Sequence, residues 1–409
     1  MMPSLRLLAL AAASLLIATS AVAGTQLIGI GSNGGVTAID AATASVTTIG
    51  PVTGLIDADV IGGFELGPDG FYYAHSTGSA PKLFRIDPDT WSATLVAPLA
   101  VGFCTEGGLA IAPNGAAWFA NVGANPPILH RVDLNTGAVT SIAPIGNQNI
   151  DLNGLDIRGD GQLVGLDSVS GTLITIDPQT ALTAPLGNAP GMLGSSGGMT
   201  IVGGVGYYCT AGPGAATPGS NRLFQFDPFT GVTTNLGSFS GMMAFEGFFG
   251  LASGEAPVGT TYCSGDGSGA TCPCGNVGGF GIGCANSSGS GASLFGDGST
   301  SVLQDDLVLT CLGMPAQKPS LLFVGTQQVN GGAGALFGDG LRCVGGPIQR
   351  LGVQVSDAGG AATWGPNLAP AGGWSAGDLR RFQVWYRDTA GPCATGFNLS
   401  QGIEIVFAP

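Results

Sequence analysis

The sequence predicts an all-β protein in which a five-bladed β-propeller is followed by a disulfide-stapled β-sandwich-like domain. The first observation is a turn formed by a hydrophobic residue and Asp, which recurs with Asp-to-Asp steps of 47, 46, 44 and 50 residues. A period of roughly 40–50 residues with strand-like flanks is typical of propeller blades. The second observation is that seven of the nine cysteines follow the last repeat. The five aspartates are Asp40, Asp87, Asp133, Asp177 and Asp227.

Each repeat contains the pattern of four short strands. In the third repeat we expect strands at residues 108–112, 117–121, 128–132 and 138–142. The first two strands are joined by Pro113-Asn114-Gly115, and Asn-Gly supplies the positive φ angles that tight hairpins need. Four antiparallel strands per period make one propeller blade. A glycine opens the first strand of each repeat, and these glycines are Gly63, Gly108, Gly154, Gly198 and Gly247.

The two ends of the array each supply part of one blade. Residues 26–30, 36–39 and 45–49 form three strands without a first strand, whereas residues 247–251 form a first strand with no successors. Together they complete a blade and close the ring, which removes exposed strand edges that would invite aggregation. We therefore expect five blades in residues 24–253.

The N-terminus has the features of an export signal. Arg6 precedes an apolar run over residues 7–17, and Ala21-Val22-Ala23 is a small-residue cleavage site. The run is shorter than the ~20 residues that span a bilayer, and no later stretch is long enough for a membrane helix. We expect residues 1–23 to be removed and the protein to be extracellular, periplasmic or at the cell surface; an uncleaved anchor is the alternative.

Composition and charge narrow the range of partners. Hydrophobic residues make up 44% of the chain and charged residues only 9%, which indicates a folded, glycine-rich β protein and not a disordered one. The formal net charge is −14 and no basic patch exists, so nucleic acid and anionic membranes are poor partners. An extracellular glycan or a protein is compatible with this charge, although solubility alone explains it.

A change of composition at residues 254–261 indicates a linker, and residues 262–409 form the Cys/Gly-rich second domain. In an exported protein its cysteines indicate disulfides. A metal cluster around Cys272-Pro273-Cys274 is the alternative, but the region lacks His and paired C-x-x-C motifs. We expect the disulfides Cys343–Cys393 and Cys274–Cys284, because Cys343 and Cys393 each lie in a turn beside an expected strand.

Both regions resemble known protein families. Through its hydrophobic–Asp–Pro–x–Thr–Gly turns, the first resembles the propeller-like repeats of exported bacterial proteins. The second is similar to a Cys/Gly-rich domain at the C-terminus of exported bacterial proteins, through Cys272-Pro273-Cys274-Gly275-Asn276, residues 337–346 and Gly391-Pro392-Cys393. These resemblances imply an architecture and no activity. They also imply that Cys311 is the unpaired thiol, because such domains need no cysteine there.

Catalytic motifs are absent from the sequence. His75 and His130 are the two histidines, and neither has a nucleophile motif nearby. The candidate ligand-binding site is the mouth of the propeller channel, where carboxylates and an amide converge on the axis. Such oxygens could hold Ca²⁺ or provide an acid/base pair for glycosidic cleavage, and a hydrated channel without a ligand is the plainer alternative. The candidates are Glu65, Glu106, Asp151, Asn153, Asp156 and Glu246, with Asp57, Asp59 and Asn149 in the loops before them.

The sequence favours a non-catalytic binding or surface-interaction protein, without cofactor unless Ca²⁺ binds in the channel. The alternative is an extracellular propeller hydrolase or lyase that acts on polysaccharide with channel carboxylates or Ca²⁺. Two histidines and scattered carboxylates favour binding over catalysis.

Overall fold

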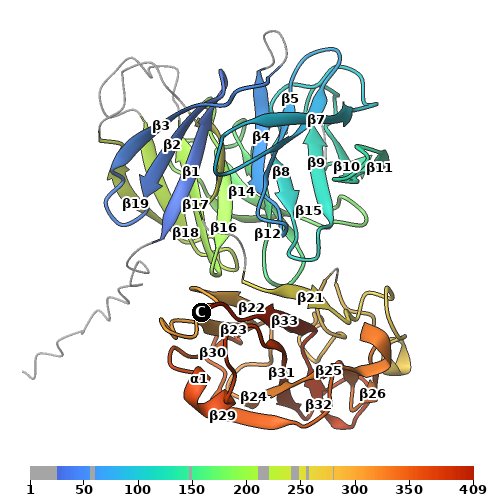
Figure 1. Ribbon diagram of the computed structural model, residues 1–409. Helices are drawn as coiled ribbons and strands as arrows, with labels where there is room; N and C mark the ends of the chain where they lie inside the picture. Colours follow the sequence, from blue (N-terminus) through green and yellow to red (C-terminus); the bar gives the residue numbers. More distant parts are fainter. Residues whose placement is uncertain are drawn as a thin grey trace, which may run out of the picture.

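The computed structural model describes residues 25–55, 60–146, 150–210, 221–240, 248–254, 258–279 and 281–409. A β-propeller forms the N-terminal part, and a smaller β domain with the chain's C-terminus lies against one end of it (Figure 1). The all-β prediction is confirmed: strands form both parts, and the one α-helix in the described ranges, α1 (Ala369–Gly372), is a single turn.

The propeller consists of five four-stranded antiparallel sheets, one for each predicted blade. In each sheet the strands follow chain order from the first, innermost strand to the outermost one, apart from the blade that closes the ring. The four continuous blades are β4 (Ile61–Leu66), β5 (Tyr72–Ser76), β6 (Lys82–Ile86), β7 (Ala93–Pro98); β8 (Leu109–Ile111), β9 (Ala117–Asn121), β10 (Ile128–Val132), β11 (Val139–Pro144); β12 (Leu152–Ile157), β13 (Leu163–Asp167), β14 (Thr172–Ile176), β15 (Thr183–Asn188); and β16 (Met199–Val202), β17 (Val205–Thr210), β18 (Arg222–Phe226), β19 (Thr233–Ser238).

The closing blade is assembled from both ends of the repeat array. Strand β20 (Phe248–Ser253) pairs antiparallel with β1 (Gln26–Gly31), with Leu251 opposite Gly29. Strands β2 (Gly35–Asp40) and β3 (Val46–Pro51) complete the sheet in the order β20-β1-β2-β3. The predicted closure of the ring is confirmed, so the inner edge of β1 is covered by a partner strand.

The recurring Asp turns hold the third and fourth strands of each blade together. In the second blade, Asp87 Oδ1 accepts hydrogen bonds from the backbone N–H groups of Asp89 and Thr90, each at 2.9 Å. The same pair of bonds, to the second and third residues after the aspartate, recurs at Asp40, Asp133, Asp177 and Asp227. The motif is therefore a folding signal, because a short polar side chain satisfies backbone donors within its own turn.

The C-terminal domain is a sandwich of two sheets. Buried side chains from both sheets, including Leu309, Trp364, Phe382 and Ile403, form one hydrophobic core between them. This confirms the predicted β-sandwich-like fold. One sheet contains β21 (Thr260–Tyr262), β33 (Gly402–Val406), β31 (Leu379–Asp388), β24 (Pro319–Gly325) and β29 (Gln349–Val355), with β32 (Gly396–Leu399) paired to β31; the other contains β22 (Ser293–Asp297), β23 (Val308–Leu312) and β30 (Ala362–Trp364).

Short elements complete the domain. Two small hairpins are formed by β25 (Gln327–Gln328) with β28 (Val344–Gly345) and by β26 (Ala335–Phe337) with β27 (Gly340–Arg342). Two 3₁₀ turns, η1 (Pro273–Gly275) and η2 (Val329–Gly332), lie among the disulfides and hairpins. Across the ranges that the structure covers, no helix is long and apolar enough to cross a membrane.

Three disulfides link the C-terminal domain, but the predicted pairing is wrong. Cys274 bonds to Cys393, not to Cys284, and Cys343 bonds to Cys263, not to Cys393. The third bond joins Cys272 to Cys284. All four cysteines of the predicted pairs therefore form disulfides, but with other partners. The reason for the Cys274–Cys393 bond is that η1 brings Cys274 beside the turn at Gly391-Pro392-Cys393. Cys311 is free and buried, as expected, and so are Cys104 and Cys209 among the described cysteines.

Candidate functional site

A ring of glycines closes the centre of the propeller. Each glycine lies on an innermost strand, or directly before one, so close to the next blade that a Cβ atom would meet backbone or a buried side chain. A Cβ on Gly198 would lie 2.6 Å from the carbonyl carbon of Gly250, and one on Gly154 would lie 2.7 Å from Met199 Cβ. The ring comprises Gly63, Gly108, Gly154, Gly198 and Gly250. Gly250 therefore takes the place that the sequence analysis gave to Gly247, which lies outside the described residues.

The glycine ring divides the predicted site into two groups. Glu106 and Asp151 precede their ring glycines and lie on the side where the chain enters the innermost strands. Glu65 and Asp156 follow theirs and lie on the side of the first hairpin turns, which faces the C-terminal domain (Figure 1). From the sequence, all four acids are expected at one mouth of the channel. In the structure, Glu106 and Asp151 lie on one side of the glycine ring, and Glu65 and Asp156 lie on the other. Glu246, Asp57, Asp59 and Asn149 lie outside the described residues.

On the entry side, where the chain enters the innermost strands, the predicted site residues are held less tightly than those on the other side. Glu106 is half-buried, and its Oε1 accepts a long hydrogen bond of 3.5 Å from Ser196 Oγ. Burial and the nearby charge of Asp151 raise the pKa of the Glu106 carboxyl. Asp151 is exposed, and its Oδ2 accepts a hydrogen bond from Ser168 Oγ at 3.0 Å. Asn153 is buried and its Oδ1 has no hydrogen-bond partner.

On the other side, Glu65 and Asp156 form a buried carboxyl pair. Their exposed fractions are 5% and 4%. Asp156 is fixed by two backbone donors, since Oδ1 accepts from Ile157 N at 2.7 Å and Oδ2 from Ile201 N at 2.5 Å. Glu65 Oε1 accepts from Leu66 N at 2.8 Å, but no donor reaches hydrogen-bond geometry at Glu65 Oε2. A buried carboxyl oxygen without a partner is costly, as are the equally unpartnered Nε2 atoms of His75 and His130.

Burial dominates the electrostatics of this pair. Loss of hydration raises the pKa of Glu65 well above its ordinary value, and the neighbouring Asp156 charge raises it further. Burial also raises the pKa of Asp156 to about 7, although the backbone donors at Ile157 and Ile201 oppose the increase. The Thr200 hydroxyl lies near both carboxyls and offsets part of the increase. The pair consequently holds protons at pH values where an exposed carboxyl is ionised.

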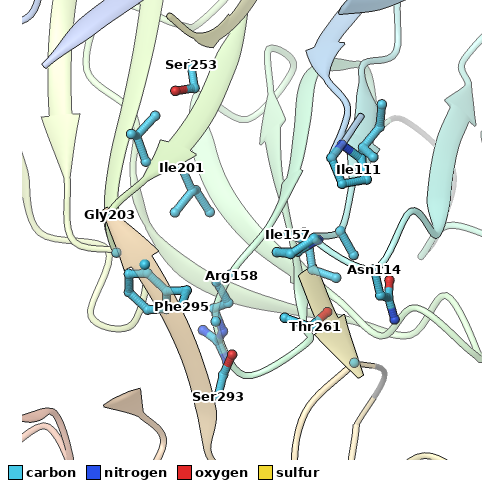
Figure 2. A pocket seen from close by; sticks show the side chains of 18 of the residues that line it. Ile111, Asn114, Ile157, Arg158, Ile201, Gly203, Ser253, Thr261, Ser293 and Phe295 are labelled. Carbon is cyan, nitrogen blue, oxygen red and sulfur yellow. The ribbon is translucent and has the colours of Figure 1, made fainter. Parts of the chain in front are cut away.

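Both carboxyls line a cavity of about 190 Å³ between the propeller and the C-terminal domain. Its propeller wall is built from equivalent positions of the innermost strands, three residues after each ring glycine. Figure 2 shows Ile111, Ile157, Ile201 and Ser253 on this side, while Thr261, Ser293 and Phe295 come from the C-terminal domain. The positions on the propeller wall are Leu66, Ile111, Ile157, Ile201 and Ser253. The cavity is therefore apolar along its wall and acidic at Glu65 and Asp156.

The C-terminal domain covers this end of the propeller by packing on its hairpin turns. Val258 forms an isolated β-bridge with Gly296 of β22, and other residues of β22 line the cavity opposite the propeller. A Cβ at Gly159 would lie 2.9 Å from Leu312 Cδ1, and one at Gly203 would lie 3.3 Å from Asp297 Oδ1. Glycines in these turns thus permit the close approach of the second domain.

Arg158 is the cation that lines the cavity, and it is already engaged. Its Nε donates to Asp160 Oδ1 at 2.7 Å, one NH group donates to the carbonyl of Pro228 at 3.0 Å, and the guanidinium lies over the Phe229 ring. Asp297 of β22 adds a further acid to the lining. Three acidic residues, Glu65, Asp156 and Asp297, and one arginine, Arg158, therefore line the cavity.

The histidines form no part of this site. His75 is fully buried beside the glycine ring, and burial lowers its pKa to about 4. Its ring lies 5.4 Å from that of Phe119, which stacks on His130 at 5.0 Å. His130 Nδ1 and Ser141 Oγ are 3.1 Å apart. These imidazoles pack between the second and third blades and act as core side chains.

Sequence reasoning identified the two buried acids but missed Thr200 and the apolar wall. Glu65 and Asp156 were selected as residues two positions after a repeat glycine, and the same rule applied to Gly198 gives Thr200. The residues of the propeller wall lie one position further along, three residues after each ring glycine. No local signal indicated Phe295 or Thr261, because their place depends on how the second domain docks.

One protein-family profile matches part of the chain. The profile of a protein family described as a repeat of unknown function (DUF6923) matches residues 11–192, within the propeller and the segment before it. It does not reach the C-terminal domain, so the resemblance proposed for that domain has no counterpart in the comparison. A search of curated proteins finds no match.

The solved structures that match this chain are distant from it, with low sequence identities and TM-scores. TolB from Acinetobacter baumannii is 14% identical with a TM-score of 0.36, and the match covers 71% of this chain and 61% of TolB. A chain of the nidogen/laminin complex is 14% identical with a TM-score of 0.39 over 57% of this chain and 99% of that one. Virginiamycin B lyase from Staphylococcus aureus is 13% identical with a TM-score of 0.31 over 53% and 70%. At this distance the similarities carry no argument about activity.

Proposed function

We propose that the protein is an exported, non-catalytic binding protein whose ligand site is the cavity between the propeller and the C-terminal domain. The observation that carries the proposal is the cavity itself, which is lined by two buried acidic residues, Glu65 and Asp156. A ligand that donates hydrogen bonds to this part of the lining would compensate for the desolvation of the pair. Export is supported by the three disulfides, which persist in oxidising compartments.

The dimensions of the cavity favour a compact ligand. Since a cavity of roughly 150 Å³ holds benzene, a volume of about 190 Å³ suits a small molecule. The combination of apolar walls with a few fixed polar groups is the usual composition of small-molecule sites.

The test is a small-molecule thermal-shift screen of the wild type and of Ile201→Trp, which fills the cavity. A ligand at 100 times its dissociation constant stabilises the folded state by about 2.7 kcal/mol. Ligands of the cavity should raise the melting temperature of the wild type and lose this effect in Ile201→Trp. Leu182→Trp, at a position with 72% exposure, is the matched control and should respond as the wild type does. A screen without ligands, or ligands that stabilise Ile201→Trp equally, would reject the proposal.

The second candidate function is hydrolysis or elimination on an extracellular polysaccharide, as the sequence analysis considered. The raised pKa values of Glu65 and Asp156 favour it, because an acid/base pair needs one protonated and one ionised carboxyl near neutral pH. An assay for reducing-sugar release, with Glu65→Gln as the inactive control, distinguishes it from binding alone.

Ca²⁺ is the ion to be tested beside both functions. Among the residues that the structure describes, no group of three or more His, Cys, Asp or Glu side chains is placed to hold a metal. Ca²⁺ binding stays a proposal from the sequence, for which Asp151 on the entry side is a described candidate, whereas Asp57, Asp59 and Asn149 lie outside the described residues. A melting temperature that rises with millimolar Ca²⁺ would support it, and an unchanged one would reject it.

A further inference from the structure

We propose that the outer face of the larger sheet in the C-terminal domain binds an anionic polysaccharide, a chain of sugars that carries carboxylates. The face is formed by β29, β24, β31 and β32, which lie at the end of the domain remote from the propeller (Figure 1). This surface is separate from the cavity and does not depend on the binding function proposed above. Its exposed aromatic side chains, its two arginines and its narrow shape carry the inference.

The register of the sheet places apolar side chains in two rows on this face. Leu321 of β24 lies opposite both Val353 of β29 and Trp385 of β31. Directly opposed residues of antiparallel strands share a face, and Trp385 packs outside the sandwich core, against Phe397. The second row lies two residues further along, where Arg387 is opposite Phe397. We call these two rows the strip, which comprises Leu321, Val353, Val355, Trp385, Arg387 and Phe397.

The strip is exposed although most of its side chains are apolar. Val353 and Val355 have exposed fractions of 66% and 62%, and Trp385 and Phe397 are half-buried. The rings of Trp385 and Phe397 are 5.7 Å apart at an interplanar angle of 34°. Contiguous exposed apolar surface marks an interaction site, and aromatic rings offer flat faces on which the C–H faces of sugar rings pack.

The charge of this face selects an anion. Arg387 has its guanidinium 5.5 Å from the centre of the Trp385 ring, and Arg350 lies opposite Phe323 at the other corner of the strip. Neither arginine forms an ion pair within the described part of the chain. Both guanidinium groups therefore remain available to bind carboxylates in a bidentate manner. Two arginines are too few to neutralise the backbone of a nucleic acid.

The acids nearest to the strip do not compensate these arginines. Asp388 follows Arg387 and so points to the opposite face of the strand, where it is 1% exposed and accepts from the Ser287 N–H. Asp357 lies beyond the end of β29, and its Oδ1 accepts from two N–H groups of its own turn. Since salt screens exposed charges beyond about 8 Å, the acidic propeller at the other end has little influence here.

The dimensions of the strip favour a chain over a folded protein. Four strands spaced about 4.8 Å apart make it roughly 15 Å long, and its two rows are about 7 Å apart. A stable protein interface buries about 800 Å² on each partner, which is several times the area of the strip. The sheet next to the strip is covered, because Val344 packs there on Phe323 and Leu399. A sugar chain laid across the strands fits, with carboxylates at Arg350 and Arg387.

The experiment measures the binding of polygalacturonate oligomers to the full-length mature protein by isothermal titration calorimetry at about 0.15 M salt. The methyl ester of the same chain lacks the charges and should bind at least ~10-fold more weakly, because charged hydrogen bonds are lost. Arg350→Gln/Arg387→Gln should weaken polygalacturonate binding ~10- to 100-fold for the same reason. Arg222→Gln, at an exposed position of the propeller, is the matched control and should bind as the wild type does.

A second variant tests the apolar part of the strip. Val353→Glu places a carboxylate at a position with 66% exposure, so the melting temperature should be retained while like-charge repulsion weakens binding ~10-fold or more. Val232→Glu, at 67% exposure in the propeller, is the matched control and should leave the affinity unchanged.

The remaining outcomes overturn the inference in distinguishable ways. Poly-L-glutamate that binds as tightly as polygalacturonate, with the same loss in Val353→Glu, replaces the sugar chain by an acidic polypeptide. Equal binding of the methyl ester rejects the role of the arginines, and unchanged binding by Val353→Glu rejects the strip. No binding of polygalacturonate or of alginate, a second uronate chain, rejects the proposal. Ile201→Trp should bind polygalacturonate as the wild type does, which separates this test from that of the cavity.

Discussion

At the scale of single residues, the burial of one pair of side chains lowers the stability of the folded protein. Glu65 and Asp156 are carboxyls in an environment that disfavours their charged forms, and neither forms an ion pair with a cation among the described residues. A propeller that needed only rigidity would have apolar or small side chains there, as it has Ala110 and Ala252 at the equivalent positions of other blades. Retention of two acids at this depth is a functional signature.

The pair predicts an unusual dependence of stability on pH. Both carboxyls have a higher pKa in the folded than in the unfolded state, so their contribution is complete below about pH 4 and is lost as pH rises through the folded pKa, about 7 for Asp156. The free energy of unfolding should fall between pH 5 and 8 by an amount on the order of a few kcal/mol. In Glu65→Gln the fall should be roughly half as large, because one titrating group and its repulsion are gone.

Urea unfolding of both proteins at pH 5, 6, 7 and 8 measures this difference. His75 acts in the opposite direction, since its lowered pKa reduces stability as pH falls below its unfolded value of about 6.5. This contribution of His75 reduces the net fall below about pH 6.5 and is the same in both proteins, so the difference between them reports the carboxyl pair. Parallel pH profiles of the wild type and Glu65→Gln would contradict the assignment.

At the scale of elements, turns and strands could be predicted from the sequence, whereas links between distant residues could not. The Asp turns and the hairpins depend on hydrogen bonds within a few residues, and the strands β9 (Ala117–Asn121) and β10 (Ile128–Val132) have the bounds that the sequence predicts. The disulfides join residues that are 80, 12 and 119 positions apart. Their pairing depends on which loops meet in space, and spacing along the chain contains no such information.

The disulfides should contribute to stability according to the loops that they close. Relative to Cys272–Cys284, the Cys274–Cys393 bond closes a loop about ten times longer, which chain entropy makes worth about 2 kcal/mol more. The double variant Cys274→Ser/Cys393→Ser should therefore lower the melting temperature of the C-terminal domain more than Cys272→Ser/Cys284→Ser. Calorimetry measures the two transitions, and non-reducing peptide mapping identifies the remaining bonds. An equal loss in both variants would contradict the loop-closure account.

At the scale of the whole molecule, the ring and the second domain make one assembly. The propeller closes through β20, and residues of the C-terminal domain line the cavity at one end of the ring. Strand β20 thus both completes the ring and contributes Ser253 to the wall of the cavity. Damage to β20 should be felt in the propeller and in ligand binding alike.

Leu251→Asp tests this coupling. Leu251 is fully buried at the pairing of β20 with β1, so an aspartate there would bury an unpaired charge and open the ring, at a cost of several kcal/mol. We expect lower solubility and loss of the cooperative unfolding transition, measured by size-exclusion chromatography and circular dichroism. Leu182→Asp, at an exposed position of the propeller, is the control and should remain monodisperse. A cooperative, soluble Leu251→Asp variant would show that closure is dispensable.

The sequence by itself determined the number of blades, the strand order and the closure between residues 24–253, because period, turn chemistry and strand alternation are local properties. It also selected Glu65 and Asp156, but it did not bring them together or separate them from Glu106. Those two acids are 91 residues apart, and their meeting depends on the curvature of the ring, on the close packing at its glycines and on the docking of β22. The cavity and the disulfide connectivity were likewise decided by the tertiary structure, since contacts between distant segments follow from packing and not from any local preference of the chain.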